Sequence, residues 1–297
     1  MMPWRRAANK TIRMEGNRVT TIPCTTNAQP LKPIFRWAGS KRKSLPTLAE
    51  FWNASFRRYI EPFAGSAALF FHLRPDRALL GDINGALIET YRVIRDRPDD
   101  VHRALVRIPR SEADYYRIRK QVPNNLQPFA RAVRFTYLNR LCFNGIYRTN
   151  GKGQFNVPYA HTRAGGMPSI EAFRQCAAAL NGATLARGDF GKILARARKG
   201  DFVYLDPPYA VSSRRIFAEY DKRAFTTDDL ERLAIHLKNI DAAGAKFVVS
   251  YADCREARDL MLPWKTRRIR VRRNVAGFIG ARRFAVELLA TNIESEG

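Results

Sequence analysis

The sequence lacks any apolar run approaching the ~18 residues that a membrane-spanning helix needs, and its first residues lack the apolar block of a secretory signal. We therefore expect a soluble, intracellular protein. Close pairs of cysteine or histidine are absent too, which excludes a disulfide framework and the usual ligand spacing of a zinc site. The four cysteines and four histidines are scattered, at Cys24, Cys142, Cys176, Cys254, His72, His102, His161 and His236. We expect reduced thiols and no metal.

Acidic residues are scarce relative to basic ones. The 297 residues include 52 Lys and Arg against 27 Asp and Glu, which gives a formal net charge of +25. With 45% hydrophobic and 11% aromatic residues the chain can fill a core, so wholesale disorder is excluded. At roughly 100–200 residues per domain, the length fits one large or two small domains.

The positive charge is concentrated in two segments. Residues 107–163 contain eleven Lys or Arg and only two acidic residues, and in residues 265–273 basic side chains alternate with Ile269 and Val271, as in a strand with one basic and one apolar face. A solubilising surface is the plain interpretation of such charge. Its concentration in two places favours a binding surface for a polyanion, and nucleic acid is the polyanion we expect.

Regular structure is expected only after residue 30. A basic extension, a targeting presequence and a start codon placed too far upstream all fit residues 1–30. Beyond them a strand ends near Tyr59–Ile60, the small residues 64–68 open a helix, and the apolar run 78–82 ends on a carboxylate. Strand, glycine turn, helix and strand form the opening of a doubly wound α/β sheet.

The middle of the chain, residues 98–185, has a different composition, rich in Arg, Pro and Asn. Helical spacing at 111–121 and 127–141 flanks a predicted hairpin, whose Asn–Gly–Lys–Gly turn lies at 150–153. We interpret 98–185 as an inserted, mostly helical module that carries one protruding hairpin.

Strands and helices alternate again after this module. The predicted elements are a buried strand at 202–206, a helix at 227–243, a strand at 246–250 and a terminal strand pair at 265–273 and 284–292. Residues 31–97 and 186–297 thus form one sheet domain that the module interrupts.

The loop after the first strand has the features of a nucleoside site. Gly65 lets the backbone approach a ligand, and Asp82 lies 17 residues on, near the ~20 expected for a carboxylate that binds ribose hydroxyls. A glycine turn in any βα unit has the same pattern. Because Ala67 interrupts a full G-x-G-x-x-G sequence, the loop favours a cofactor without a pyrophosphate.

A sharper signal follows the strand at 202–206. Asp206, two prolines and Tyr209 come directly after its apolar residues, at the carboxyl end where open α/β sheets bind ligands. A strand stop, a helix cap and a core tyrosine are the structural alternatives. Because proline nitrogens carry no hydrogen, Pro207 and Pro208 leave a loop that offers only acceptors beside an aromatic ring. Such a loop suits a planar group with an exocyclic NH2.

These four residues resemble the DPPY motif of amino-methyltransferases that act on adenine in DNA. Other stretches resemble, in order, segments of the DNA adenine methylase (Dam) family, the D12 class of N6-adenine methyltransferases. They are Phe35–Lys41 for F-x-K-W-A-G-G-K, Glu61–Ser66 for the E-P-F-x-G-x-G cofactor loop, Gly81–Asn84 for the acidic end of the second strand, and Tyr137–Arg140, Phe143–Gly145 and Gly153–Tyr159 for the recognition segment.

The resemblance implies a Rossmann-like methyltransferase fold and S-adenosylmethionine as the methyl donor. It assigns donor binding to Trp37, Lys41, Phe63, Gly65, Asp82, Asp189, Phe190 and Asp206. It assigns the catalytic loop to Asp206, Pro207, Pro208 and Tyr209. Hydrogen bonds to Asp206 and to the Pro207 carbonyl would draw the amine towards tetrahedral geometry for in-line attack on the methyl group, without a metal or a covalent intermediate.

The resemblance also implies double-stranded DNA as the substrate, with the target adenine flipped out of the helix. The module at 98–185 would recognise the target through Arg140, Phe143, Asn144, Arg148, Asn150 and Pro158. Arginine pairs with guanine and asparagine with adenine, although most arginine contacts go to phosphate. The best-known members of the family methylate GATC. We expect a monomer in the cytoplasm of a bacterium or of a phage-infected cell, with or without a partner restriction endonuclease.

Two other functions stay open. An RNA or cytosine amino-methyltransferase would usually carry Asn or Ser in place of Asp206, and a DNA-binding relative without catalysis would have a broken tetrapeptide. Two residues depart from the family pattern, since Ser40 and Ala67 each replace a glycine. A salt bridge that buries the side chain of residue 206, or a side chain that faces away from the donor, would contradict the expected chemistry.

Overall fold

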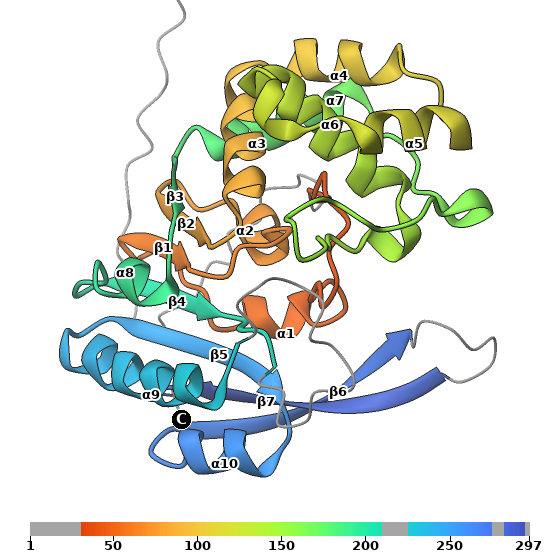
Figure 1. Cartoon of the computed structure of the whole chain (residues 1–297). Helices are drawn as coiled ribbons and strands as arrows, with labels where there is room; N and C mark the ends of the chain where they lie inside the picture. Colours follow the sequence, from red (N-terminus) through yellow and green to blue (C-terminus); the bar gives the residue numbers. More distant parts are fainter. Residues whose placement is uncertain (1–30, 210–224, 275–281, 295–297) are drawn as a thin grey trace, which may run out of the picture.

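The computed structural model describes residues 31–209, 225–274 and 282–294, so the predicted basic extension lies outside the described residues. The chain forms a seven-stranded sheet in the order β3-β2-β1-β4-β5-β7-β6 (Figure 1). Its strands are β1 Arg58–Glu61, β2 Ala78–Asp82, β3 Ala183–Arg187, β4 Asp201–Leu205, β5 Lys246–Ala252, β6 Lys265–Asn274 and β7 Arg282–Thr291.

The first five strands are parallel, and β7 runs antiparallel to both of its neighbours. β1 pairs with β2 and with β4, so that Ile60 lies opposite Leu79 on one side and Val203 on the other. β7 pairs with β5 and with β6. The strand order reverses between β1 and β4, where doubly wound sheets bind ligands beyond the carboxyl ends of their strands. The predicted α/β class, with a doubly wound mixed sheet, is confirmed.

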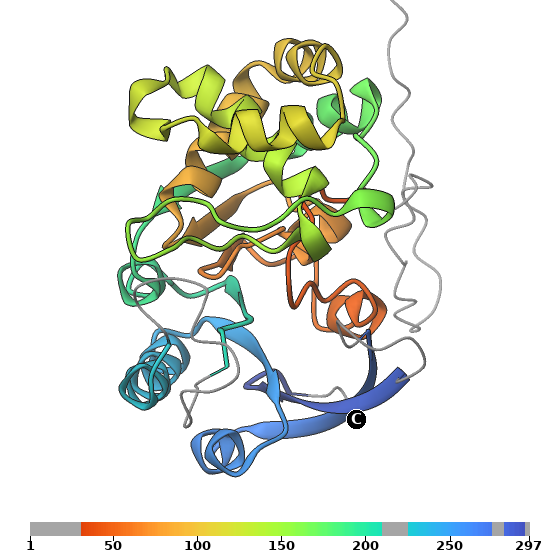
Figure 2. The same ribbon diagram turned by 45° about the vertical axis from the view of Figure 1, so that its right-hand side comes forward.

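Helices gather in two groups around the sheet. Those in the described residues are α1 Leu45–Ala49, α2 Ala68–Leu73, α3 Gly85–Asp96, α4 Pro98–Val106, α5 Glu112–Lys120, α6 Pro128–Leu141, α7 Ile170–Leu180, α8 Phe190–Leu194, α9 Thr227–Ala242 and α10 Arg255–Met261. Helices α4 to α7 lie together at one end of the molecule, whereas α9 and α10 lie at the other, with the β6–β7 pair (Figures 1 and 2). Within the described ranges, no helix combines the length and the apolar character that spanning a bilayer requires.

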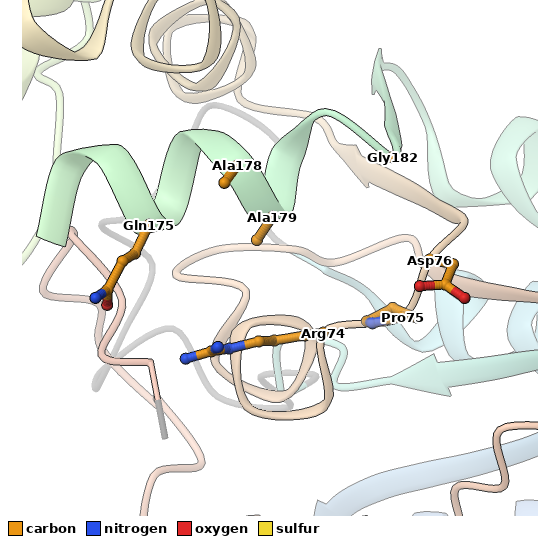
Figure 3. Close-up of a pocket in the computed structure, with 7 residues that line it drawn as sticks. All are labelled: Arg74, Pro75, Asp76, Gln175, Ala178, Ala179 and Gly182. Carbon is orange, nitrogen blue, oxygen red and sulfur yellow. The ribbon is translucent and has the colours of Figure 1, made fainter. Parts of the chain in front are cut away.

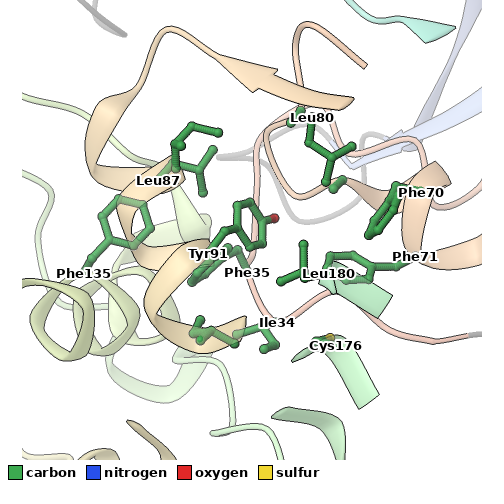
Figure 4. Close-up of a cluster of buried hydrophobic side chains, with 14 of the residues drawn as sticks. Ile34, Phe35, Phe70, Phe71, Leu80, Leu87, Tyr91, Phe135, Cys176 and Leu180 are labelled. Atoms are coloured by element: carbon green, nitrogen blue, oxygen red, sulfur yellow. The ribbon is translucent and has the colours of Figure 1, made fainter. Parts of the chain in front are cut away.

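The core consists of two clusters on opposite faces of the sheet. Tyr59 and Ile60 are neighbours in β1, and because strand side chains alternate, Tyr59 packs into the larger cluster and Ile60 into the smaller one. In the larger cluster Phe35 meets Tyr91 of α3 and Phe135 of α6, with ring centroids 5.0 and 5.4 Å apart (Figure 4). This cluster therefore joins the segment before α1, the sheet and the helices that cover it.

The predicted hairpin is present, although its two arms are joined by isolated bridges and not by a continuous strand pair. Isolated antiparallel bridges join Thr149 to Phe155 and Cys142 to Tyr159. The Gly153 amide donates to the Asn150 carbonyl at 2.8 Å, which closes the expected turn.

One predicted boundary needs correction, and one helix start is confirmed. The boundary between 185 and 186 falls inside β3, whose residues pair with β2 from Ala183 to Arg187, so the sheet domain resumes earlier than predicted. The helix α9 begins at Thr227 as predicted, and Thr226 caps it: the Asp229 amide donates to the Thr226 hydroxyl, and the Asp229 carboxylate accepts from the Thr226 amide. These two reciprocal hydrogen bonds between Thr226 and Asp229 form a capping box, which fixes the start of the helix.

Candidate active site

Three carboxyl groups meet at one edge of the sheet. Glu61 is the last residue of β1, Asp82 is the last residue of β2, and Asp206 directly follows β4. Because these strands are parallel and adjacent, their carboxyl ends lie side by side. This edge contains the reversal between β1 and β4, and it is the candidate active site.

Asp82 fixes the loop after β1. Its Oδ2 accepts a hydrogen bond from the Gly65 amide at 2.9 Å, and its Oδ1 accepts one from the Asn84 amide at 2.8 Å. The following residue, Ile83, is 46% exposed although it is apolar. It offers a hydrophobic surface beside the acid. The sequence analysis did not single out Ile83, although its place directly after the acidic strand end was a usable signal.

Glu61 is a buried acid with a raised pKa. Burial raises the pKa of Glu61 well above its usual range, and the nearby carboxylates of Asp206 and Asp82 raise it further. The Tyr59 hydroxyl donates a 2.9 Å hydrogen bond to Glu61 Oε2, which acts in the opposite direction. The raised pKa favours the uncharged form of Glu61, which limits the negative charge at an edge that already holds two other acids.

Lys41 pairs with the expected catalytic acid. Its Nζ lies 3.1 Å from Asp206 Oδ1, 3.1 Å from Glu287 Oε1 and 3.4 Å from the Tyr209 hydroxyl. The Lys41 side chain is 6% exposed and that of Asp206 is 22% exposed. Asp206 is thus paired with Lys41 but keeps contact with solvent. A salt bridge that buried its side chain would have contradicted the expected role, and the structure does not show such burial. Glu287 was missed because nothing in its own sequence context marks it.

The two prolines and the tyrosine of this loop have different surroundings. Pro207 is buried, Pro208 is exposed and Tyr209 is half-buried. The Tyr209 ring meets Tyr251 of β5 at a centroid distance of 5.1 Å and an interplanar angle of 78°. This edge-to-face contact holds the loop against the neighbouring strand.

Trp37 connects the loop after β1 with the predicted hairpin. Gly65 has φ +47°, and a Cβ atom at this position would lie 2.7 Å from atoms of the Trp37 ring. Trp37 also stacks on Tyr147, with centroids 6.2 Å apart and planes inclined by 14°. The structure therefore brings Trp37 and Gly65 together as expected, and it adds Tyr147, which the sequence analysis did not select.

The two departures from the family pattern lie in adjoining loops. Ser66 Oγ donates a hydrogen bond of 3.3 Å to Ser40 Oγ, so one departure adds a contact between the loops. Ala67 has φ 49° and ψ 42°. This is the left-handed region, which glycine enters without strain and alanine does not.

Phe63 and Phe190 pack together with centroids 5.3 Å apart, and Phe225 lies 6.1 and 5.9 Å from them. Asp189 caps α8: its Oδ1 accepts from the Gly191 amide at 2.9 Å and pairs with Arg232 at 2.7 Å. The sequence selected Phe63, Asp189 and Phe190. It missed Phe225 and Arg232, which reach this cluster only through folding.

Arg140, a candidate DNA contact, is engaged within the protein. Its guanidinium donates to the carbonyls of Gly166 and Ile34, the latter at 2.9 Å. Burial lowers the pKa of Arg140 to about 10, and nearby arginines act in the same direction. The side chain ties α6 to two loops, so a contact with a base would have to compete with these hydrogen bonds.

Asn150 closes the hairpin turn with its side chain. Its Oδ1 accepts from the amides of Lys152 and Gln154, each at 3.0 Å. Arg148 lies beside this turn, half-buried, and its Nε donates to Asn156 Oδ1 at 2.9 Å. Asn150 thus has a structural role in the turn, and Arg148 is also hydrogen-bonded within the hairpin.

The remaining candidate DNA contacts lie around one short turn. Phe143 and Asn144 belong to a 3-10 turn, Phe143–Gly145, in which Asn144 has φ 53°. The Phe143 amide donates to the Pro158 carbonyl at 2.9 Å. Pro158 is exposed, and Phe143 and Asn144 are half-buried. The sequence thus selected residues that the fold brings together.

A pocket of about 310 Å³ lies at the opposite edge of the sheet (Figure 3). Asp76 and Gly182 line it, and they precede β2 and β3. It includes none of the candidate site residues. In the described part of the chain, no group of three or more His, Cys, Asp or Glu side chains is arranged to hold a metal ion.

The family model of the D12 class N6 adenine-specific DNA methyltransferases matches residues 37–276. The chain belongs to this D12 class. The match includes the Lys41 segment, the loop after β1, the hairpin and the Asp206–Tyr209 loop. The expected family, enzyme class and adenine specificity are confirmed.

Curated relatives of this methyltransferase agree with the family. It is 31% identical to the type II methyltransferase M1.LlaDCHI of Lactococcus lactis subsp. cremoris, over 88% of this chain and 95% of that protein. It is 30% identical to the DNA adenine methylase of Escherichia coli strain K12, over 87% of this chain and 94% of that protein. It is 33% identical to the retron Ec67 DNA adenine methylase of Escherichia coli, over 88% and 92% of the two chains.

Proposed function

We propose that this enzyme transfers a methyl group from S-adenosylmethionine to N6 of an adenine flipped out of double-stranded DNA. The observation that carries the proposal is the position of the Asp206–Tyr209 loop. It begins at the carboxyl end of β4, beside Glu61 and Asp82, and it keeps the Asp206 carboxylate partly exposed.

The residues at this edge suit the chemical groups of the donor. The Asp82 carboxylate is held in place by two backbone amides and can accept hydrogen bonds from ribose hydroxyls. Ile83 and the Phe63–Phe190 pair supply apolar surface for a purine. The missing side chain of Gly65 lets the Trp37 ring pack directly against the loop after β1. When bound, S-adenosylmethionine supplies a methyl group that its sulfonium makes electrophilic.

The chain's own contribution is to prepare the amine. The nitrogen lone pair of an adenine amine is delocalised into the ring, so the amine is a poor nucleophile. Hydrogen bonds to Asp206 and to the Pro207 carbonyl would pull its hydrogens out of the ring plane and localise the lone pair. Tyr209 would hold the flipped base by stacking. Positioning and electrostatics then supply most of the acceleration.

DNA recognition is assigned to residues 98–185, with Arg148 as the main base contact and GATC as the first target sequence to test. The exposed side chains of Arg267, Arg268 and Arg270 on β6 would lie against the phosphate backbone. A monomer that works in the cytoplasm of a bacterial or phage-infected cell completes the proposal.

The test is methyl transfer from labelled S-adenosylmethionine to unmethylated duplex DNA, with wild type, Asp206→Asn and Asp259→Asn compared. Asp259 is a 65% exposed acid on α10 and provides the matched control. We expect Asp206→Asn to lose on the order of a thousandfold in rate, as when a group that acts only in the transition state is removed. The control should match wild type.

Equal incorporation by wild type and Asp206→Asn would contradict the mechanism. Sequencing of the modified positions decides between the substrates: methylcytosine, or label only on RNA, would replace the proposed target. Tight DNA binding with no transfer by wild type would point to a DNA-binding relative without catalysis.

A further inference from the structure

The ammonium group of Lys41 lies between two carboxylates from distant parts of the chain. Its Nζ is 3.1 Å from Asp206 Oδ1 and 3.1 Å from Glu287 Oε1. Asp206 follows β4, whereas Glu287 lies in β7, opposite Ala252 of β5. The two carboxylates therefore share one positive charge.

These carboxylates differ in burial and in support. Glu287 is 3% exposed and Asp206 is 22% exposed. Glu287 sits within paired strands, between β5 and β6, and the Ser250 hydroxyl donates to its Oε2 at 3.4 Å. Asp206 belongs to a loop and keeps contact with solvent. Glu287 is thus the supported partner of Lys41, and Asp206 is the accessible one.

Lys41 stays charged in this position. Burial by itself lowers the pKa of Lys41, but the carboxylates of Asp206 and Glu287 and the Tyr209 hydroxyl outweigh it, and the pKa lies above its usual value. If Glu287 lost its charge, Asp206 would be the main group that keeps the pKa of Lys41 high against the effect of burial. The ammonium would then bind Asp206 more tightly, at the oxygen where a substrate amine would have to bind.

We propose, on the basis of the proposed function, that Glu287 is a positioning residue that holds the Lys41 ammonium and leaves Asp206 able to accept the adenine amine. An ammonium and a neutral amine both form charge-assisted hydrogen bonds to a carboxylate, but only the ammonium adds the attraction of a full positive charge. An unshared Lys41 would therefore outcompete the substrate amine for Asp206. No covalent bond forms or breaks in this step; only the hydrogen bonds of Lys41 redistribute between the two acids.

A purely structural role is the alternative, since Glu287 is buried in the sheet and its removal could simply loosen the fold. The two roles differ in one measurable respect. A positioning residue acts through Lys41, so its effect on the rate vanishes once Lys41 is gone. A structural residue lowers activity whether or not Lys41 is present.

The experiment measures kcat and the KM for DNA in full-length wild type, Glu287→Gln, Lys41→Met and the double variant. We expect Glu287→Gln to lower kcat by about tenfold, the size of coupling usual for residues in contact, with the KM for DNA nearly unchanged. In the Lys41→Met background the same change should have no further effect. Losses that multiply in the double variant would overturn the proposal.

A second measurement needs no turnover. Lys41 is acetylated with an N-hydroxysuccinimide ester at pH 9 and the labelled peptide is followed by mass spectrometry. Glu287→Gln lowers the Lys41 pKa, so more of the amine is neutral and labelling should be about tenfold faster than in wild type. In a parallel reaction with iodoacetamide, the buried thiols of Cys142 and Cys176 should stay unmodified in both proteins, which excludes unfolding as the cause.

Two variants complete the test. Glu294→Gln changes an exposed glutamate beyond β7 and should match wild type in both measurements. Glu287→Asp keeps the charge and should recover part of the rate. If the wild type transfers methyl groups but Glu287→Gln has the same kcat and the same Lys41 labelling rate as the wild type, the positioning role alone is overturned. A wild type that transfers no methyl group overturns the proposed function first, and the positioning role with it.

Discussion

At the scale of single residues, Gly65 is a position of the candidate site that leaves no room for a side chain. Its φ of +47° disfavours a side chain, and a Cβ would press into the Trp37 ring at 2.7 Å. Gly39 has φ +77° but no atom within 4 Å of a Cβ. A comparison of substitutions at the two glycines therefore separates the cost of backbone strain from the cost of steric overlap.

We predict that Gly65→Ala lowers stability by more than Gly39→Ala and weakens donor binding as well. Gly39→Ala should cost only the left-handed backbone, about 1–2 kcal/mol. Gly65→Ala adds the displacement of Trp37. Urea unfolding and isothermal titration with S-adenosylmethionine measure the two effects. Equal losses of stability in the two variants would show that the Trp37 ring can move aside without a cost in free energy.

The cysteines provide a second prediction at this scale. Burial raises the pKa of Cys142 and of Cys176 from 9.0 to about 12. At pH 8 the reactive thiolate of each is therefore about a thousandfold scarcer than for an unperturbed thiol, because each pKa unit is a factor of ten. Iodoacetamide should spare both in the native protein and modify both in urea. Rapid native modification would contradict their burial.

At the scale of elements, the active-site edge depends on loops that helices and strands hold at their ends. Asn84 caps α3 by accepting from the Leu87 amide at 3.1 Å, directly after the Asp82 and Ile83 pair. Thr226 caps α9, directly after Phe225. Both caps fix where a chain segment leaves the site.

For this reason we predict that Thr226→Ala destabilises the protein by about 1 kcal/mol, the usual cost of a lost cap. The neighbouring Thr227 is exposed inside the first turn, so Thr227→Ala is the matched control and should change stability by less than half as much. Thermal or urea unfolding provides the comparison. If both variants were equally unstable, the capping box would not be the source.

At the scale of the whole molecule, charge and architecture act together. The net charge of +25 is large for 297 residues. Exposed arginines on β6 and the basic residues of 107–163 lie on elements that extend from the two ends of the sheet. β4, which leads into Asp206, lies inside the sheet, and β5 and β7 separate it from β6.

DNA binding should accordingly be strongly salt-dependent. A protein that neutralises several phosphates loses affinity with a log–log slope of about −0.9 per phosphate, so we expect at least a hundredfold loss between 50 and 200 mM salt. Arg270→Gln should reduce the slope by about 1. Arg196→Gln, an exposed arginine before β4 at the opposite edge, is the control. Fluorescence anisotropy with labelled duplex gives the slopes, and salt-independent binding would contradict this surface.

The sequence by itself determined the sheet class, the strand ends at Asp82 and Asp206, and the loop at Gly65. These features are local, since a strand end, a glycine turn and a Pro–Pro loop are written in consecutive residues and their consequences act over a few bonds. The hairpin turn at Asn150 was readable for the same reason.

Only the tertiary structure decided which side chains complete the site. Glu287 reaches Lys41 across 246 residues, and Tyr147 reaches Trp37 from a different element. It also showed Arg140 tied to backbone carbonyls, where its sequence context had indicated a DNA contact. Such contacts follow from strand order and from β7 entering between β5 and β6. That order is set by packing of the whole core, which no short stretch of residues encodes.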